Sequence, residues 1–177
     1  RRHSFPTRRS SDLLTDGKVD FDIKLVQMVR LLRGGEPVKM SKRSGSFVTL
    51  ADVIEEVGKD VVRFTMLTRK SDAQMDFDFA KVVEASKDNP VFYVQYAHAR
   101  ISTLLEKASY QAKAVDLSTA LRPEEKEIVK QLSYFEHALQ EAAKGYSPAL
   151  LANYTYELVK LYNTFYQSVK IVIEPDQ

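Results

Sequence analysis

The sequence contains no cysteine and no tryptophan, and only three of its 177 residues are histidine. Without cysteine the chain forms neither a disulfide framework nor a thiolate metal site, and it has no cysteine nucleophile. The histidines, His3, His98 and His137, are too scattered along the chain for a credible zinc site. We therefore expect no protein-bound metal.

Long apolar runs are missing as well. A membrane-spanning helix needs about 18–20 consecutive apolar residues, and no such run is present. The hydrophobic content of 44% nevertheless excludes a mostly disordered chain. The length suits one medium-sized domain or two small ones. The composition is compatible with a cytoplasmic protein, and that is the location we expect.

The chain has almost no excess of one charge sign once the first thirteen residues are set aside. The whole chain has 26 basic and 24 acidic residues, a net charge of +2. Residues 1–13 hold four arginines and one aspartate, so the remainder has 22 basic and 23 acidic residues, a net charge of −1. Any binding of nucleic acid must therefore come from a local patch and not from a global field.

Residues 1–13, RRHSFPTRRSSDL, differ from everything that follows. They are basic and serine-rich, show neither helical nor strand periodicity, and lack the apolar segment of a secretory signal. A flexible tail, a phosphate-binding arm and translated cloning sequence all fit this composition. We exclude the segment from functional inference.

Strand patterns dominate the next stretch. Apolar and charged residues alternate over 19–24, and the apolar run 25–32 is typical of a buried strand. Gly34-Gly35 predicts a turn, and Pro37-Val38 a short return strand. Residues 39–45, Lys-Met-Ser-Lys-Arg-Ser-Gly, then form a basic loop that we call the lysine loop.

Helix signals follow the lysine loop. Thr49, with Asp52 three residues later, predicts the start of a helix over 50–56 that ends at Gly58. A second helix is expected from Lys59 or Asp60 to Thr68. Residues 70–78 are polar and read as extended, so we place a domain boundary between 78 and 79.

The remainder of the sequence predicts an antiparallel helical bundle. The expected helices cover 80–87, 90–107, 123–144 and a fourth segment that starts at Ser147-Pro148. Asn89-Pro90 marks the start of the second of these helices, and Gly145 marks the end of the third. Residues 109–118 read as a linker. The fold class is therefore mainly α.

The lysine loop is the strongest candidate for chemistry. Three cations, two hydroxyls and a glycine follow a strand there, and flexible ammonium groups can follow charge that moves onto a phosphate. Composition alone does not distinguish this role from that of an ordinary solvated loop.

The order of the motifs goes further. Lys39-Met40-Ser41-Lys42 resembles the signature loop of class I aminoacyl-tRNA synthetases. Residues 19–75 and the string SKDNPVFYVQYAHAR, residues 86–100, look like bacterial-type arginyl-tRNA synthetase. The string LLANYTYELVKLYNTFYQ, residues 150–167, looks like the helical anticodon-binding domain of the same family.

The resemblance implies a specific organisation. Residues 14–78 would be the end of a nucleotide-binding α/β catalytic domain, and residues 79–177 an all-α anticodon-binding domain that is incomplete at its C-terminus. The family's His-Ile-Gly-His-like motif and its arginine pocket do not occur in this sequence. We therefore expect a fragment that is inactive alone. Without the family's upstream sheet, the strand expected over 25–32 would have no parallel neighbours.

The resemblance also implies roles for the lysine loop. The family activates L-arginine with ATP, which we expect to act together with Mg2+, and transfers it to tRNA(Arg). The complete enzyme is expected to be a monomer. Lys39 and Lys42 match the lysines that stabilise charge on the transferring phosphate group. Ser41 would contact phosphate, and the backbone around Met40 would contact adenine.

The helix expected over 90–107 supplies the candidate RNA contacts. Val91, Val94, His98, Ile101 and Leu105 share one stripe, so we expect His98 in the core. Tyrosines on a helix are commonly core residues too. The resemblance makes Tyr93 and Tyr96 candidates for stacking on anticodon bases, with Arg100 and also Arg69 as phosphate partners.

Two further questions stay open in the sequence. Asp76 and Asp78 are paired carboxylates, for which capping or a turn is the favoured role over metal binding or acid–base catalysis. The alternative for the whole chain is a non-catalytic helical tRNA- or protein-binding module with a vestigial lysine loop.

Overall fold

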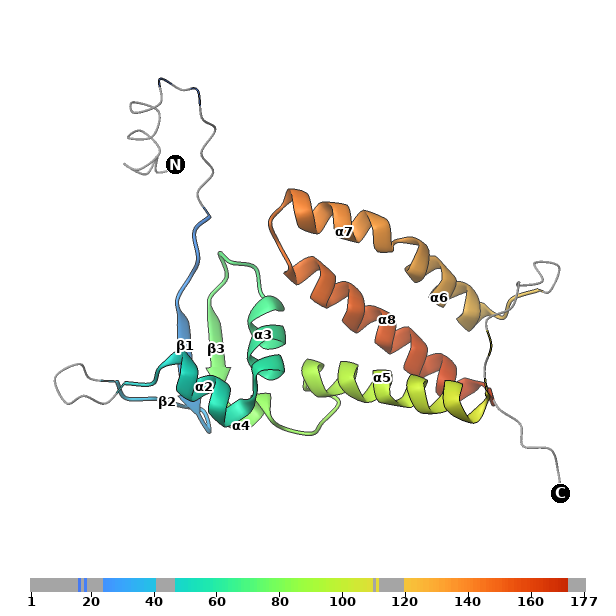
Figure 1. Ribbon diagram of the computed structural model, residues 1–177, viewed down its shortest axis with the longest axis horizontal. Helices are drawn as coiled ribbons and strands as arrows, with labels where there is room; N and C mark the ends of the chain where they lie inside the picture. The colour runs from blue at the N-terminus through green and yellow to red at the C-terminus, as the bar shows by residue number, and fades with distance from the viewer. Residues whose placement is uncertain are drawn as a thin grey trace.

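The computed structural model describes residues 16, 18, 24–40, 47–109, 111 and 120–171. Within them a small sheet with two covering helices lies at one end of the molecule, and long helices form the other end (Figure 1). The chain is thus mainly helical with a small mixed sheet, which confirms the predicted class. None of the helices in this described part has both the length and the apolar character that a membrane crossing requires.

The sheet has the strand order β2-β1-β3, formed by β1 (Val29–Arg33), β2 (Glu36–Pro37) and β3 (Met75–Asp78). β1 pairs antiparallel with β2 and parallel with β3, where Val29 is opposite Met75 and Leu32 is opposite Asp78. The expectation of a strand without a parallel neighbour was therefore wrong. The extended segment 70–78 supplies that neighbour, although 46 residues separate Val29 from Met75.

The predicted strand over 25–32 was placed too early. Ladder pairing begins at Val29, where β3 becomes available, and Leu25, Val26 and Met28 are 54%, 74% and 84% exposed. An apolar run that finds no covering layer in the described part of the chain remains at the surface. The Gly34-Gly35 turn was predicted correctly, and both glycines have positive φ, 62° and 88°, as a tight hairpin requires.

Two helices cover the sheet. α2 (Leu50–Val57) begins with the predicted capping box, in which the Thr49 hydroxyl accepts from the Asp52 amide and the Asp52 carboxylate accepts from the Thr49 amide. Gly58, at φ 86°, ends α2 and starts α3 (Lys59–Leu67). Both helices were predicted from the sequence.

The core between the sheet and these helices consists of apolar side chains from α2, α3, β3 and α4 (Phe79–Val82). Its buried members are Val53, Val57, Val62, Phe77 and Phe79. The rings of Phe77 and Phe79 meet edge to face at 5.6 Å. α4 therefore packs with the sheet, just after the predicted domain boundary, which itself stays a prediction.

α4 is shorter than the helix predicted over 80–87. The Asn89 amide group donates to the carbonyls of Val82 at 2.9 Å and of Glu84 at 2.8 Å. A continuing helix would need those same carbonyls for its own N–H groups. Asn89 thus ends α4 and, with its side-chain oxygen, caps the next helix.

The helical end of the molecule contains α5 (Pro90–Lys107), α6 (Pro123–Ser133), α7 (Phe135–Lys144) and α8 (Ala149–Ser168). α8 lies between α5 on one side and α6 with α7 on the other (Figure 1). Alanines are buried where the helices approach one another, namely Ala97, Ala138, Ala142, Ala149 and Ala152. The predicted bundle is confirmed.

The single helix predicted over 123–144 is in fact two. It breaks at Tyr134, whose amide bonds to the Gln131 carbonyl at 3.2 Å. The hydroxyl of Tyr154, on α8, donates to the same carbonyl at 3.0 Å. Gln131 therefore no longer accepts from the residue four positions on, and the helix restarts at Phe135.

Candidate nucleotide-loop stem and RNA-binding face

The lysine loop starts at the end of the hairpin. After β2, the Val38 amide donates to the Leu31 carbonyl at 2.9 Å, and Lys39 and Met40 follow as exposed residues. We call residues 36–40 the loop stem. Ser41 and Lys42 lie outside the described residues, so the structure places Lys39 and Met40 but not the other two candidates.

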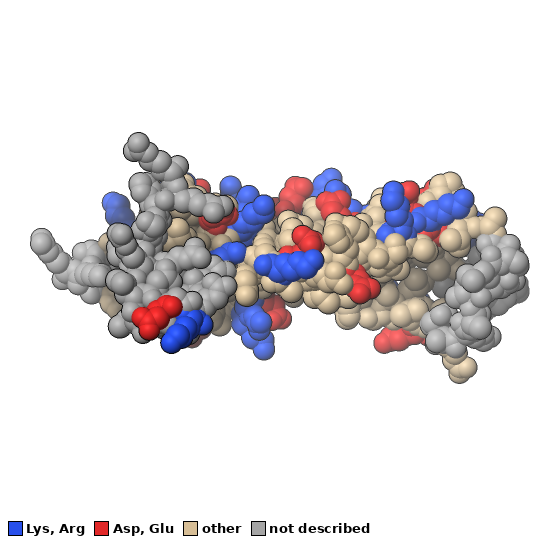
Figure 2. All heavy atoms as spheres, turned by 90° about the horizontal axis from the view of Figure 1, so that it is seen from above, with Lys and Arg blue, Asp and Glu red and all other residues tan. Residues whose placement is uncertain are grey.

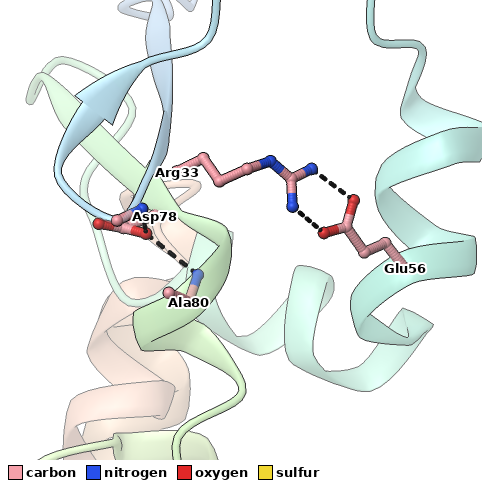
Figure 3. A network of polar contacts seen from close by, with 5 residues as sticks. Arg33, Glu56, Asp78 and Ala80 are labelled. Carbon is pink, nitrogen blue, oxygen red and sulfur yellow. Dashed lines mark hydrogen bonds and ion pairs between the residues drawn. The ribbon is translucent and has the colours of Figure 1, made fainter.

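Asp78 holds the turn that precedes the loop stem. Its carboxylate is buried, with 4% of the residue exposed, and accepts from the amides of Gly34 at 3.0 Å and Gly35 at 2.7 Å. The same carboxylate accepts from the Ala80 amide at 3.0 Å and thereby caps α4 (Figure 3). The favoured capping and turn role of Asp78 is confirmed.

The electrostatics of Asp78 follow from these contacts. Burial opposes ionisation and by itself would raise the pKa of the carboxyl. The three backbone N–H donors and the nearby Lys81 ammonium outweigh burial, so that the pKa of Asp78 lies below its ordinary value. The group is an anion at neutral pH and a strong acceptor for the turn.

A second polar link connects the two sides of the lysine loop. Arg33, at the end of β1, forms a bidentate pair with Glu56 of α2 at 2.6 and 2.8 Å (Figure 3). The guanidinium also lies 4.7 Å from the centre of the Phe79 ring. The hydrogen bonds to Glu56 raise the pKa of Arg33, and those to Arg33 lower the pKa of Glu56. Both side chains are largely exposed, so solvent screens the pair and it contributes little to stability.

Asp76, the other member of the carboxylate pair, lies two residues before Asp78 on β3 and is exposed. It forms a bidentate surface pair with Arg30 at 2.7 and 2.9 Å. The two carboxylates therefore bind different partners, Arg30 for Asp76 and the turn amides for Asp78, and they share no ligand or proton.

The candidate RNA residues of α5 separate into inward and outward positions. Tyr96 is 48% exposed, whereas Tyr93 is half-buried against Tyr156 of α8, with ring centres 5.5 Å apart. Tyr96 stacks on Phe92 with ring centres 5.9 Å apart and planes 14° from parallel. Of the two predicted tyrosines, Tyr96 is the more exposed to solvent.

Arg100 lies between two tyrosine rings. Its guanidinium is 4.7 Å from the centre of the Tyr96 ring and 4.6 Å from that of Tyr166 on α8. It donates to the Tyr96 hydroxyl at 2.9 Å and to the buried Asn163 side chain at 3.1 Å. Among the residues that the structure describes, Arg100 thus has acceptors for two of its five guanidinium N–H groups.

The face of α5 that packs inward is rotated from the predicted stripe. His98 is exposed, so the expectation of a core histidine was wrong. Ala97, fully buried, lies at the centre of the inward face, and Leu104 replaces the 45%-exposed Leu105. The small Ala97 side chain lets α8 approach closely. Tyr93 and Arg100 lie on the same side of α5 as Ala97 and contact α8.

Arg69, the remaining candidate, is exposed just after α3. It lines a cleft of about 360 Å³ at the junction of α3, α5 and α8, together with Asp88, Asn153 and Tyr156. Neither Tyr96 nor Arg100 lines this cleft. Over the face seen in Figure 2, basic and acidic side chains are intermingled along the described residues.

Comparisons with known proteins agree on one family. The model of the DALR anticodon binding domain matches residues 94–177. An arginine–tRNA ligase from Novosphingobium aromaticivorans is 60% identical over 148 residues, which are 82% of this chain and 25% of that protein. One from Methylobacterium nodulans is 50% identical over 167 residues, 89% of this chain and 28% of that protein.

Solved structures give the same result. The chain superposes on an assigned arginyl-tRNA synthetase from Campylobacter jejuni with a TM-score of 0.76 and 31% identity, covering 85% of this chain and 33% of that one. For arginyl-tRNA synthetase from Thermus thermophilus the TM-score is 0.64 and the identity 29%, covering 80% of this chain and 27% of that one. This chain matches the C-terminal portion of arginyl-tRNA synthetases.

The match to the synthetase family is partial in length. The chain spans about a quarter of the curated relatives named above. The DALR anticodon binding domain begins within α5, at residue 94, and therefore includes Tyr96 and Arg100 but not Tyr93.

Sequence reasoning missed three residues that contact Tyr96 or Arg100: Phe92, Asn163 and Tyr166. Asn163 had a usable signal, because it follows Val159 by four positions and so shares its face of α8, which is buried and where an amide needs a partner. Tyr166 had none, because its contact with Arg100 spans 66 residues of sequence.

Proposed function

We propose that this chain supplies two parts of an arginine–tRNA ligase, the lysine loop for ATP and the helical face for the anticodon of tRNA(Arg). The complete ligase joins L-arginine to tRNA(Arg) at the expense of ATP, taken up with Mg2+, and acts in the cytoplasm as a monomer. The similarity of this chain to arginine–tRNA ligases along 82–89% of its length carries the proposal.

In the activation step, Lys39 and Lys42 stabilise the negative charge that develops as pyrophosphate leaves the α-phosphate of ATP. Ser41 donates to a phosphate oxygen, and the backbone around Met40 lies against adenine. The exposure of Lys39 at the end of a hairpin supports this assignment, because an ammonium on a flexible stem can follow moving charge.

On the helical side, Tyr96 offers its ring to an anticodon base that is splayed out of the loop. Arg100 contributes its remaining N–H groups to a phosphate, and Arg69 meets the RNA at the α3 junction. Tyr93 supports the face from beneath through Tyr156. The 48% exposure of Tyr96 beside the Arg100 guanidinium is the observation that favours an RNA-binding face.

The test uses a chimaera in which this chain replaces the matching segment of the Novosphingobium aromaticivorans ligase. We expect Lys42→Ala and Lys39→Ala each to lower the rate of ATP–pyrophosphate exchange about 100-fold, the effect of losing one transition-state donor. Lys59→Ala, an exposed lysine at the start of α3, is the matched control. Unchanged exchange in both loop variants would favour a binding module with a vestigial loop.

The isolated chain is the second arm of the experiment. Because the arginine pocket is not among its residues, we expect it to bind tRNA(Arg) weakly and to catalyse no exchange. Turnover by the isolated chain would overturn the assignment of the pocket to another part of the ligase.

A further inference from the structure

We infer that Asp78 is a positioning residue for Lys39, which it acts on through the Gly34-Gly35 turn. The inference rests on the proposed role of Lys39 in the ATP reaction and adds a residue 39 positions away in the sequence. Asp78 touches neither Lys39 nor the loop stem directly; its contacts are with the turn that aims the stem.

The hairpin has little of its own to fix its direction. β2 consists of two residues, one of which is Pro37, which has no backbone N–H to donate. Its ladder with β1 comprises Leu32 opposite Pro37 and Arg33 opposite Glu36, followed by the bond from the Val38 amide to Leu31. A two-stranded hairpin of this size is marginal in water.

β1, by contrast, is held firmly. It pairs with β3 over four residues, and Leu31 packs against the core that contains the fully buried Phe77. The direction of the loop stem is therefore decided at the turn between a fixed strand and a weak one.

Asp78 fixes that turn at two consecutive amides. One carboxylate oxygen accepts from Gly34 and the other from Gly35, so the carboxylate constrains the orientation of the turn as well as its position. The residue is 4% exposed, and so water does not readily replace it. Lys39 follows Gly35 by four residues along the stem, and any tilt of the turn moves it.

A purely structural role is the competing explanation, because Asp78 also caps α4 through Ala80. Two substitutions separate the roles. Asp78→Ser keeps a hydroxyl that can cap a helix but is too short to reach the turn. Asp78→Asn keeps the shape but replaces one acceptor oxygen with an N–H donor that faces the turn amides.

The experiment measures ATP–pyrophosphate exchange by the chimaera, together with thermal unfolding and tRNA(Arg) binding. We expect both Asp78 variants to lower kcat about 10- to 100-fold, the effect of misplacing a catalytic group by about 1 Å. The KM for arginine and the Kd for tRNA should stay within about 2-fold. Asp76→Asn, the same substitution at an exposed position of the same strand, is the control and should retain full activity.

A double-mutant cycle identifies the residue through which Asp78 acts. If Asp78 works by placing Lys39, Asp78→Asn should change exchange by less than about 2-fold once Lys39 is alanine. Multiplying effects, normal kcat in Asp78→Ser, or a lowered Tm with unchanged kcat would each overturn the inference. Full exchange activity in Lys39→Ala itself would instead refute the proposed role of Lys39.

Discussion

Tyr96 presents an accessible aromatic ring whose hydroxyl is tied to Arg100. The stacking surface and the hydrogen bond can be separated by substitution, because phenylalanine keeps the ring and loses the hydroxyl. The guanidinium would still lie over the ring in the phenylalanine variant, through contact with Tyr166 and the bond to Asn163.

We expect Tyr96→Ala to weaken tRNA(Arg) binding by about 1–3 kcal/mol, the contribution of one stacked base. Tyr96→Phe should lose well under half of that. Filter binding of the chimaera at fixed salt measures both, and ATP–pyrophosphate exchange serves as the control that should not change. Equal losses of tRNA binding and exchange in Tyr96→Ala would show that the ring supports the fold instead.

Asp78 also makes stability depend on pH. Its pKa in the folded chain lies below the ordinary value, so it stabilises the fold above the unfolded-state pKa of about 3.9 and loses that contribution as pH falls through the folded pKa. Asp78→Asn should therefore be less stable than the original chain at pH 7, with the difference shrinking in acid. Urea midpoints between pH 3 and 7 measure this. Parallel profiles for the two chains would contradict it.

At the scale of elements, Asn89 joins the sheet-containing part to the helices. It is 8% exposed, and its side chain both caps α5 and donates to two carbonyls at the end of α4. One residue thus ends one helix and starts the next, which fixes the angle between them.

Asparagine is required at this junction for its donors as much as for its oxygen. Asn89→Asp keeps the cap but points a carboxylate at two carbonyl oxygens, and we expect it to cost about 1–3 kcal/mol in the free energy of unfolding. Thr49→Ala, an exposed cap on α2, is the comparison and should cost about 1 kcal/mol. Urea unfolding measures both; an Asn89→Asp variant as stable as the original would show that the donors contribute nothing.

At the scale of the whole molecule, the apolar segment before β1 is open to solvent. Val26 and Met28 are 74% and 84% exposed and precede a paired strand, an arrangement that favours association between chains. The helical end has exposed apolar residues too, such as Val129 at 51%, but its backbone hydrogen bonds are already made within the helix.

We therefore expect the isolated chain to aggregate through this segment. Val26→Lys with Met28→Lys should reduce light scattering at a given concentration, and should change the free energy of unfolding by less than about 1 kcal/mol because both positions are exposed. Val129→Lys is the matched control on a helix. An equal reduction by the control would place the contact elsewhere.

The sequence by itself determined the local features of this protein. The Thr49–Asp52 capping box, the Gly34-Gly35 turn and the Asn89-Pro90 helix start all depend on atoms within a few residues, so side-chain chemistry is enough to specify them. The order of motifs around the lysine loop was likewise enough to indicate the resemblance to arginyl-tRNA synthetases.

Only the tertiary structure decided which side chains meet. Asp78 bonds to Gly34 across 44 residues, Arg100 bonds to Asn163 across 63, and Tyr154 breaks a helix at Gln131 from 23 residues away. Each contact depends on how closely the elements pack. Small buried residues such as Ala97 allow a close approach between helices. The periodicity of the sequence does not specify how closely two helices pack. For this reason the inward face of α5 could be identified only in the folded chain.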